Sequence, residues 1–278
     1  MKILVRREAA RGDVLVASAV APALKKKYDG CKIAFYTKCP SVLTKNIYID
    51  FVTDSTDILE EEFDLRIDLD MAYENRPTTH VLQAYADVAQ VPIEDCKLYI
   101  HCERVNMPLF NNYVVVHAGI TNWVGRNWSN EGWRNLALQL HDNGYQIVCV
   151  GAGGDRFVPS DADVRNKATI NEVATIMKGA KLFVGIDSLP MHIAQAVGTP
   201  GVVFFGSIRP DLRLINSNME AIIAKDLSCL GCHHKKACST VTDVCETGTL
   251  DCEHLVSTDQ MVERVLSRLN CLSLPLLS

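Results

Sequence analysis

A group of polar side chains that could do chemistry lies in the segment GIDSLPMHIAQAVGTPGVVFFG, residues 185–206. Asp187, Ser188 and His192 stand there between a buried apolar run and a short helical pattern. The N-terminus of a helix presents unpaired N–H groups and partial positive charge, so this place could hold a phosphate with help from Ser188 and His192. In the alternative, purely structural interpretation, Asp187 caps the helix, Pro190 begins its first turn and His192 packs in the core.

Two other strand ends carry charge. Asp13 follows the apolar run KILV and opens a helical pattern, where the helix N-terminus favours an ionised carboxylate that can act as a general base. The alternative role of Asp13 is that of a helix cap. Arg126 lies in HAGITNWVGRNW, residues 117–128. It could neutralise a leaving phosphate, or it could be a solvated arginine beside a packed tryptophan.

Apolar runs and helical patterns alternate along the chain. Helices are predicted over residues 12–28, 77–90, 130–143, 171–178, 190–197 and 258–269, with short buried strands between them. This alternation predicts an α/β protein whose parallel sheets carry helices on both faces. Two successive series predict two doubly wound domains, residues 1–108 and 109–278, which suits a chain of 278 residues. Ligands of such sheets bind beyond the carboxyl ends of the strands, so the polar strand ends of both domains should face one cleft.

Charge and hydropathy limit the partners. The net charge of −5 gives no reason to expect nucleic acid. No apolar run reaches the roughly 20 residues that cross a bilayer, and the N-terminus lacks a signal-peptide pattern, so we expect a cytoplasmic protein with at most peripheral membrane contact. The segment ARGD, residues 10–13, has a single glycine and does not match a dinucleotide fingerprint, so no nicotinamide cofactor is expected.

The chain has 11 cysteines, and five of them lie between residues 229 and 252. Without a secretory signal, this cluster predicts a structural metal knot for zinc or iron rather than a disulfide framework. Cys229 and Cys232 have the spacing of a zinc knuckle, and three cysteines and two neighbouring histidines compete for the remaining places. We expect the ligands to be Cys229, Cys232, Cys238 and Cys252. The alternative is a set of reduced thiols around a loop.

Taken together, these motifs resemble glycosyltransferase family 9, the ADP-heptose heptosyltransferases of lipopolysaccharide synthesis. The first strand followed by R..GD-V-L is similar to the opening of that family, and residues 117–128 resemble its H-[AG]-x(n)-K-x-W element. The segment 185–206 resembles the signature D-[ST]-G-x-x-H-x-A-x-A-x-G-[TV]-P-x-[VL]-x-L-[FY]-G. The residues that match it are Asp187, Ser188, His192, Ala194, Ala196, Gly198, Thr199, Pro200, Phe205 and Gly206.

The resemblance implies a GT-B fold, in which two Rossmann-like domains face a central cleft. It also implies an inverting transfer that needs no catalytic metal, with Asp13 as the general base and Arg126 beside the leaving group. The donor would be ADP-heptose or another nucleotide sugar, and the acceptor a glycan, a lipid-linked molecule or a protein. The residues expected to hold the donor are Gly12, His117, Gly119, Gly151, Asp155, Asp187, Ser188, Leu189, His192 and Gly206.

Two positions depart from the family pattern. Leu189 stands where the signature has glycine, and Arg126 stands where the family generally has lysine. The N-terminal half is also short. These departures motivate one alternative function, a non-catalytic binding or assembly protein on the same fold. The other alternative is a sugar-nucleotide epimerase.

Overall fold

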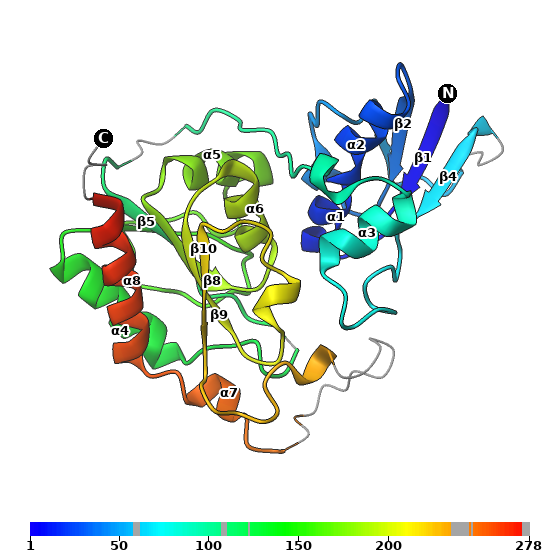
Figure 1. The fold of residues 1–278 in the computed structure, drawn as a ribbon. Helices are drawn as coiled ribbons and strands as arrows, with labels where there is room; N and C mark the ends of the chain where they lie inside the picture. The colour runs from blue at the N-terminus through cyan, green and yellow to red at the C-terminus, as the bar shows by residue number, and fades with distance from the viewer. Residues whose placement is uncertain (58–61, 107–109, 122, 235–244, 246, 274–278) are drawn as a thin grey trace, which may run out of the picture.

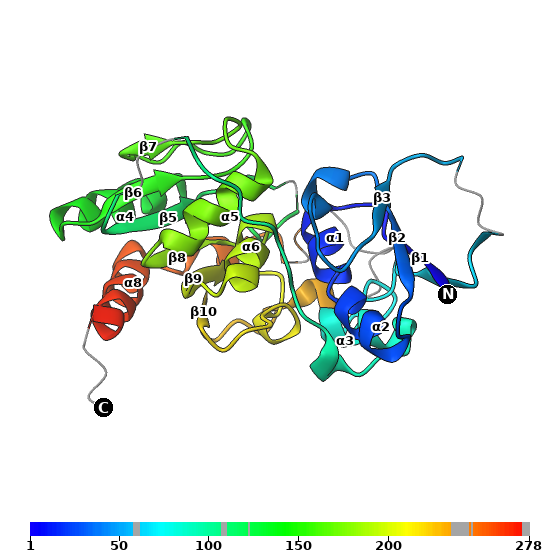
Figure 2. The same cartoon turned by 90° about the horizontal axis from the view of Figure 1, so that it is seen from above.

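The structure is a computed structural model that describes residues 1–57, 62–106, 110–121, 123–234, 245 and 247–273. Two separate parallel sheets, each flanked by helices, form its two halves (Figures 1 and 2). The first sheet has four strands in the order β3-β2-β1-β4, and the second has six in the order β10-β9-β8-β5-β6-β7. The α/β class and the two Rossmann-like domains expected from the sequence are therefore confirmed.

The N-terminal sheet is built from the shorter series of elements. These are β1 (Lys2–Arg6), α1 (Arg11–Ala17), α2 (Val20–Lys27), β2 (Lys32–Tyr36), the 3-10 turn η1 (Pro40–Leu43), β3 (Phe51–Thr53), β4 (Leu65–Asp68), α3 (Val81–Ala89) and the 3-10 turn η3 (Ile93–Asp95). The expected boundary after residue 108 lies outside the described residues and stays a prediction.

Two of the predicted helices differ from the observed ones. The single helix expected over residues 12–28 is two helices, because Pro22 has no N–H for the carbonyl of Ser18 and its ring would crowd that carbonyl. The helix expected from residue 77 begins at Val81. It begins there because the ring of His80 accepts a hydrogen bond from the N–H of Leu82, which satisfies one free N–H group of the first turn.

The C-terminal sheet is larger, and three of its strands, β5, β8 and β9, are entirely buried. Its elements are β5 (Tyr113–His117), α4 (Asn130–Asp142), β6 (Gln146–Cys149), β7 (Ala162–Asp163), α5 (Ile170–Gly179), β8 (Leu182–Ile186), α6 (Leu189–Val197), β9 (Gly201–Phe205), the 3-10 turn η4 (Pro210–Leu212), β10 (Met219–Ile223), the 3-10 turn η5 (Cys232–His234), α7 (Asp251–His254) and α8 (Thr258–Ser273).

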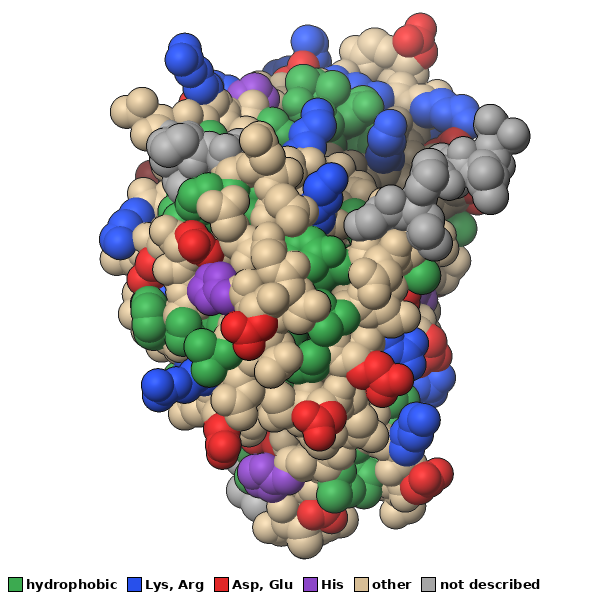
Figure 3. All heavy atoms as spheres, turned by 90° about the vertical axis from the view of Figure 1, so that its left-hand side faces the viewer, with side chains coloured by type: hydrophobic (Ala, Val, Ile, Leu, Met, Phe, Trp, Pro, Cys, Tyr) green, Lys and Arg blue, Asp and Glu red, His purple; other side chains and the backbone are tan. Residues whose placement is uncertain are grey.

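Helices α4 and α8 close the outer face of this sheet (Figure 1). Trp128 and Trp133 pack edge to face beneath them, with ring centroids 5.0 Å apart. On this end of the molecule, charged side chains of both signs are scattered among apolar ones (Figure 3). No helix in the described part of the chain is long and apolar enough to span a membrane.

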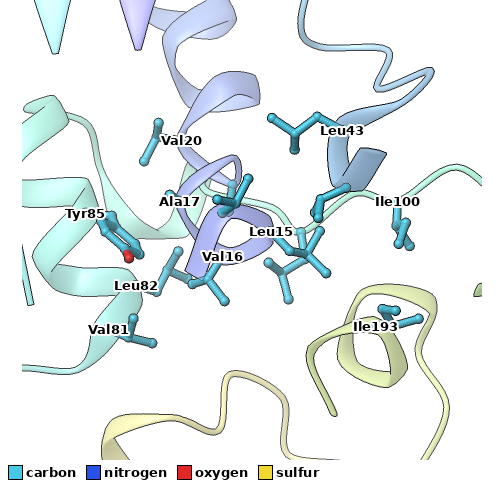
Figure 4. Packing of buried hydrophobic residues seen from close by; sticks show 14 of the residues in the cluster. Leu15, Val16, Ala17, Val20, Leu43, Val81, Leu82, Tyr85, Ile100 and Ile193 are labelled. Carbon is cyan, nitrogen blue, oxygen red and sulfur yellow. The ribbon is translucent and has the colours of Figure 1, made fainter. Parts of the chain in front are cut away.

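Helices α1 and α6 join the two halves. They lie side by side in both ribbon views, and one buried apolar cluster runs through them (Figures 2 and 4). Leu15 and Val16 of α1 lie in this cluster with Ile193 of α6. Gly12 permits the close approach, because a Cβ atom there would lie 3.2 Å from Cδ2 of His192. The packing therefore brings the N-termini of the two helices together at one edge of both sheets.

Candidate active site

A cavity of about 670 Å³ opens where the carboxyl ends of the strands of the two domains face each other. Its volume falls in the range that suits a small-molecule ligand. All but one of the predicted catalytic and donor-binding residues line it. These are Gly12, Asp13, His117, Gly119, Arg126, Gly151, Asp155, Asp187, Ser188, Leu189 and His192.

Gly206 is the exception. It lies beside the cavity wall, where a Cβ atom would come within 2.2 Å of the carbonyl oxygen of Gly125. Its missing side chain therefore lets the loop around Gly125 pack against the end of β9. The position of Gly206 supports a packing role and not the expected contact with a donor.

The N-terminus of α6 forms part of the cavity wall. Ser188 is its N-cap residue and makes no side-chain cap. Pro190 has no N–H group and the N–H group of Met191 donates to the carbonyl oxygen of Ser188, so the N–H group of Leu189 is the one left for a ligand in the first three residues of the helix. The expectation that Asp187 caps this helix is wrong, because its carboxylate turns toward Arg126 instead. The Leu189 side chain lines the wall and leaves the cavity open.

The hydroxyl of Ser188 is oriented by a chain of hydrogen bonds. Ser188 Oγ lies 3.0 Å from His117 Nδ1, and His117 Nε2 lies 3.2 Å from Asp155 Oδ2. A carboxylate only accepts, so Nε2 of His117 carries a proton in this pair, and Nδ1 is the hydrogen-bond partner of the Ser188 hydroxyl. Ser188 then presents an oxygen lone pair to the cavity.

Asp155 is held as an anion. Burial alone would raise the pKa of its carboxyl, but hydrogen bonds from His117 and from the backbone N–H groups of Ile120 and Ala152 outweigh burial and lower the pKa to about 2. Gly151 has a φ of 142°, and a Cβ atom there would come 2.3 Å from Asp155 Oδ2. Only glycine leaves room for this carboxylate.

His192 is a buried, neutral donor. Gln195 uses its Oε1 atom to accept from the backbone N–H groups of Ile215 and Asn216, so its Nε2 atom is the one that donates to His192 Nδ1 at 3.4 Å. The remaining ring proton is therefore on Nε2, 4.0 Å from Asp187 Oδ1. Burial lowers the pKa of the ring and outweighs the opposing effect of Asp187.

Arg126 is a positively charged residue in the same wall of the cavity. Its Nη2 atom donates to the carbonyl oxygen of Asp187 at 2.5 Å and to Oδ2 of Asp187 at 2.9 Å. Its guanidinium group lies 5.3 Å from the centre of the Trp123 ring. The Nε atom is buried and has no hydrogen-bond partner among the described residues. An oxyanion in the cavity would satisfy this unused donor.

Asp13 faces the α6 wall from the first turn of α1, and the cap of that helix is Ala10. Oδ2 of Asp13 pairs with Nη2 of Arg7 at 3.2 Å, and the same atom of Arg7 pairs with Glu74 at 2.5 Å. Arg7 and Glu74 are both buried. Arg7 therefore holds the Asp13 carboxylate at the cavity wall, where a general base would have to lie.

The sequence of the chain matches that of a known protein family. A sequence model described as "Glycosyltransferase family 9 (heptosyltransferase)" matches residues 76–240, which is more than half of the chain. The chain belongs to glycosyltransferase family 9. The match covers β5 to β9 and α6, and so includes the whole C-terminal wall of the cavity.

Curated members of the family are similar over part of their length. Lipopolysaccharide heptosyltransferase 3 of Escherichia coli strain K12 is 28% identical over 135 residues, 44% of this chain and 39% of the relative. Lipopolysaccharide heptosyltransferase 1 of Pseudomonas aeruginosa is 25% identical over 135 residues, 46% of this chain and 38% of the relative. The chain thus spans about two fifths of the length of these relatives.

Solved structures of the family share the fold over nearly the whole chain. The glycosyltransferase family 9 protein of Veillonella parvula gives a TM-score of 0.77 at 16% identity and covers 97% of both chains. The dodecameric iron-containing heptosyltransferase TibC, solved with ADP-D-β-D-heptose, gives 0.76 at 16% identity, with 97% of this chain and 76% of that chain covered. These likenesses support the expected GT-B fold.

The clustered cysteines of this family member converge at the edge of the C-terminal domain. Cys229, Cys232, Cys245 and Cys252 line one small cavity of about 20 Å³. In the described part of the chain, no group of three or more Cys, His, Asp or Glu side chains is arranged as a metal site. Four thiols around one cavity nevertheless form a donor set that suits zinc or iron. The expected ligand Cys238 lies outside the described residues, and Cys245 is the cysteine found with the other three.

The cysteine cluster is joined to Arg126 through α7. Glu253, next to Cys252, accepts hydrogen bonds from the backbone N–H groups of Gly125 at 2.8 Å and Asn127 at 3.1 Å. These are the two residues that flank Arg126. The Glu253 carboxylate therefore fixes the loop that aims the guanidinium group at Asp187, and it is a positioning residue for Arg126.

Replacing Glu253 by alanine is expected to lower sugar transfer about tenfold or more, because a small displacement of a charged group is costly in a site of this kind. Glu253→Gln keeps one oxygen acceptor and should restore most of the activity. The two rates and the thermal midpoints are measured side by side, with Glu263→Ala on the exposed face of α8 as the control. Equal rates in Glu253→Ala and the wild-type protein would remove the positioning role.

Several residues of the site were not found from the sequence. Tyr73 and Arg213 line the cavity, Arg7 pairs with Asp13, and Glu74 pairs with Arg7. Arg213 follows the polar end of β9 and lies three residues beyond Pro210. Its position after the end of a strand is therefore a signal that the sequence contains. Arg7 and Glu74 are 67 positions apart and carry no signal of their pairing in the sequence.

Proposed function

We propose that the protein is an inverting glycosyltransferase that moves a sugar from a nucleotide-diphosphate donor to an acceptor hydroxyl. The observation that carries the proposal is the meeting of Asp13 from one domain with the N-terminus of α6 and Arg126 from the other around one cavity. A general base and an oxyanion-binding wall are the two features that such a reaction needs.

In the proposed reaction Asp13 takes the proton of the acceptor hydroxyl while the acceptor oxygen attacks the anomeric carbon of the donor sugar. The bond from that carbon to the diphosphate oxygen breaks on the opposite face, so the configuration inverts. Negative charge grows on the leaving nucleoside diphosphate. Arg126, through its unpaired Nε, and the N–H group of Leu189 at the N-terminus of α6 would stabilise this charge.

The donor in this proposal is ADP-heptose, because TibC was solved with ADP-D-β-D-heptose and the curated relatives are lipopolysaccharide heptosyltransferases. The nucleoside would lie near Gly151 and Asp155, and the Ser188 oxygen would accept a hydrogen bond from a donor hydroxyl. A glycan acceptor of the lipopolysaccharide type follows from the same relatives. The proposed setting is the cytoplasm, with no cofactor in the chemical step.

We also propose a structural zinc or iron ion held by Cys229, Cys232, Cys245 and Cys252. The support comes from their convergence on one cavity and from the iron that TibC is described as containing. When bound, such an ion would crosslink η5 and α7 and stiffen the loop that carries Arg126.

Donor binding tests the proposal. Titration calorimetry should show that ADP-heptose and ADP bind the wild-type protein, and that Arg126→Gln weakens ADP about tenfold to a hundredfold while weakening AMP much less. The exposed Arg134 on α4 supplies the matched control, Arg134→Gln. Incubation with ADP-heptose and a heptose-deficient lipopolysaccharide should then release ADP. If neither ADP-heptose nor ADP binds at millimolar concentration, the proposal is wrong.

A further inference from the structure

Arg213 is a buried cation that has no ionic partner among the residues that the structure describes. Its side chain belongs to the C-terminal domain, just after η4, and the residue is 8% exposed. Among the described residues it makes no side-chain hydrogen bond and no ion pair, whereas Arg7 and Arg126 each pair with a carboxylate. A charge is rarely buried unless a partner satisfies it, so this arginine needs an explanation.

The Arg213 guanidinium makes a close aromatic contact that crosses the domain boundary. It lies 4.2 Å from the centre of the Tyr73 ring, which belongs to the N-terminal domain. This contact holds one face of the guanidinium plane but satisfies none of its N–H groups. Arg213 and Tyr73 both line the large cavity, so the unsatisfied donors have access to a ligand.

The guanidinium stays charged in this position. Burial works to lower the pKa of Arg213, but Tyr73 and the carboxylates of Asp187 and Asp13 outweigh burial and raise it. Both carboxylates are already paired, Asp187 with Arg126 and Asp13 with Arg7. Neither carboxylate lies within ion-pair distance of Arg213. The N–H groups of the Arg213 side chain therefore have no acceptor among the described residues.

The surroundings of Arg213 place it on the acceptor side of the cavity. The ring of Tyr73, 4.2 Å from the guanidinium, belongs to the N-terminal domain, and Arg7, the ion-pair partner of Asp13, lies against the same ring. Asp13 of the N-terminal domain acts on the charge of Arg213, as does Asp187 of the C-terminal wall. An anion held by Arg213 would therefore lie near Asp13, which is the base proposed for the acceptor hydroxyl.

We propose that Arg213 is the centre of an oxyanion-binding site, and that the anion is a phosphate or carboxylate group of the acceptor. The assignment to the acceptor rests on the proposed function. The site itself does not, because a buried arginine with free donors facing a cavity binds an oxyanion whatever reaction follows. A planar guanidinium is well suited to either group through two parallel hydrogen bonds.

Inorganic phosphate is the probe that tests the site. It is titrated calorimetrically into the wild-type protein, first without nucleotide and then at saturating ADP, and the same titrations are made with Arg213→Gln and Arg213→Lys. We expect phosphate to bind the ADP-saturated wild-type protein, and Arg213→Gln to weaken this binding at least tenfold. Arg213→Lys should retain part of it. ADP affinity should change less than twofold in both variants.

Arg209→Gln is the matched control, because Arg209 lies in the same segment, is exposed and pairs with Asp211. Thermal midpoints check that every variant folds, and Arg213→Lys keeps the test valid if Arg213→Gln does not. If phosphate does not bind the wild-type protein, or binds it and both variants equally, Arg213 does not form an oxyanion-binding site. If Arg213→Gln weakens the binding of ADP more than that of AMP, the anion bound by Arg213 belongs to the donor, and the assignment to the acceptor is wrong. If the protein does not bind ADP, the proposed function is contradicted. The phosphate titration without nucleotide then still tests whether Arg213 binds an oxyanion.

Discussion

Replacing Asp13 by asparagine is expected to reduce sugar transfer by about a thousandfold and to leave ADP binding nearly unchanged. The amide is nearly isosteric with the carboxylate, so it keeps an oxygen toward Arg7, but it cannot take the proton of the acceptor hydroxyl. The α6 wall that would hold the diphosphate lies on the other domain and is not altered. The measurements are ADP release from ADP-heptose in the presence of acceptor, and ADP affinity by calorimetry.

Asp259→Asn provides the control for Asp13. Asp259 is also an aspartate in the first turn of a helix, but it lies on α8, outside the cavity. A rate for Asp13→Asn within threefold of the wild-type rate would remove Asp13 as the base. A parallel loss of ADP affinity would instead show that Asp13 contributes to donor binding or to the closure of α1 on α6.

Loss of the metal proposed for the cysteine cluster is expected to have the largest effect on stability. The purified protein should contain about one equivalent of zinc or iron, and removal of a ligand in Cys252→Ser should cost on the order of 5 kcal/mol, which lowers the thermal midpoint by roughly 10–20 °C. Cys252 is buried and packs against the loop of Gly125, so the damage should spread to the Arg126 loop. Elemental analysis and calorimetric melting measure both effects.

A second set of variants identifies the fourth ligand. Cys245→Ser should lose the metal and Cys238→Ser should retain it, because Cys245 lines the cavity with Cys229, Cys232 and Cys252. Cys271→Ser on the exposed surface of α8 is the control. Metal-free wild-type protein with an unchanged midpoint in Cys252→Ser would show that the cluster is a set of reduced thiols.

The local parts of the site could be predicted from the sequence with good accuracy. The segment 185–206 is indeed a strand, a short helix and a strand, and its polar residues do face the cavity. Periodicity and strand ends carry this information, because in a parallel sheet the residues that follow the strands meet at one edge. The motifs of family 9 lie in the same local segments, which is why the resemblance and the family match agree.

The errors have both distant and local causes. Asp187 has the residue type of a helix cap, but Arg126, 61 positions away, takes its carboxylate. The helix expected over residues 12–28 is broken by a local effect of Pro22, which the apolar periodicity concealed. The choice between Cys238 and Cys245 could not be made from spacing, since several spacings suit the same metal.

The sequence alone determined the fold class, the two parallel sheets and eleven of the residues that line the cavity, because these depend on patterns within single segments. Only the tertiary structure decided which charges are paired and which are free. Arg7, Glu74 and Asp13 form one network across the N-terminal domain, and Arg213 lies against Tyr73 of the opposite domain without an ionic partner in the described part of the chain. The physical reason is that the free energy of a buried charge depends on its neighbours in space, and these come from segments that the sequence does not mark as partners.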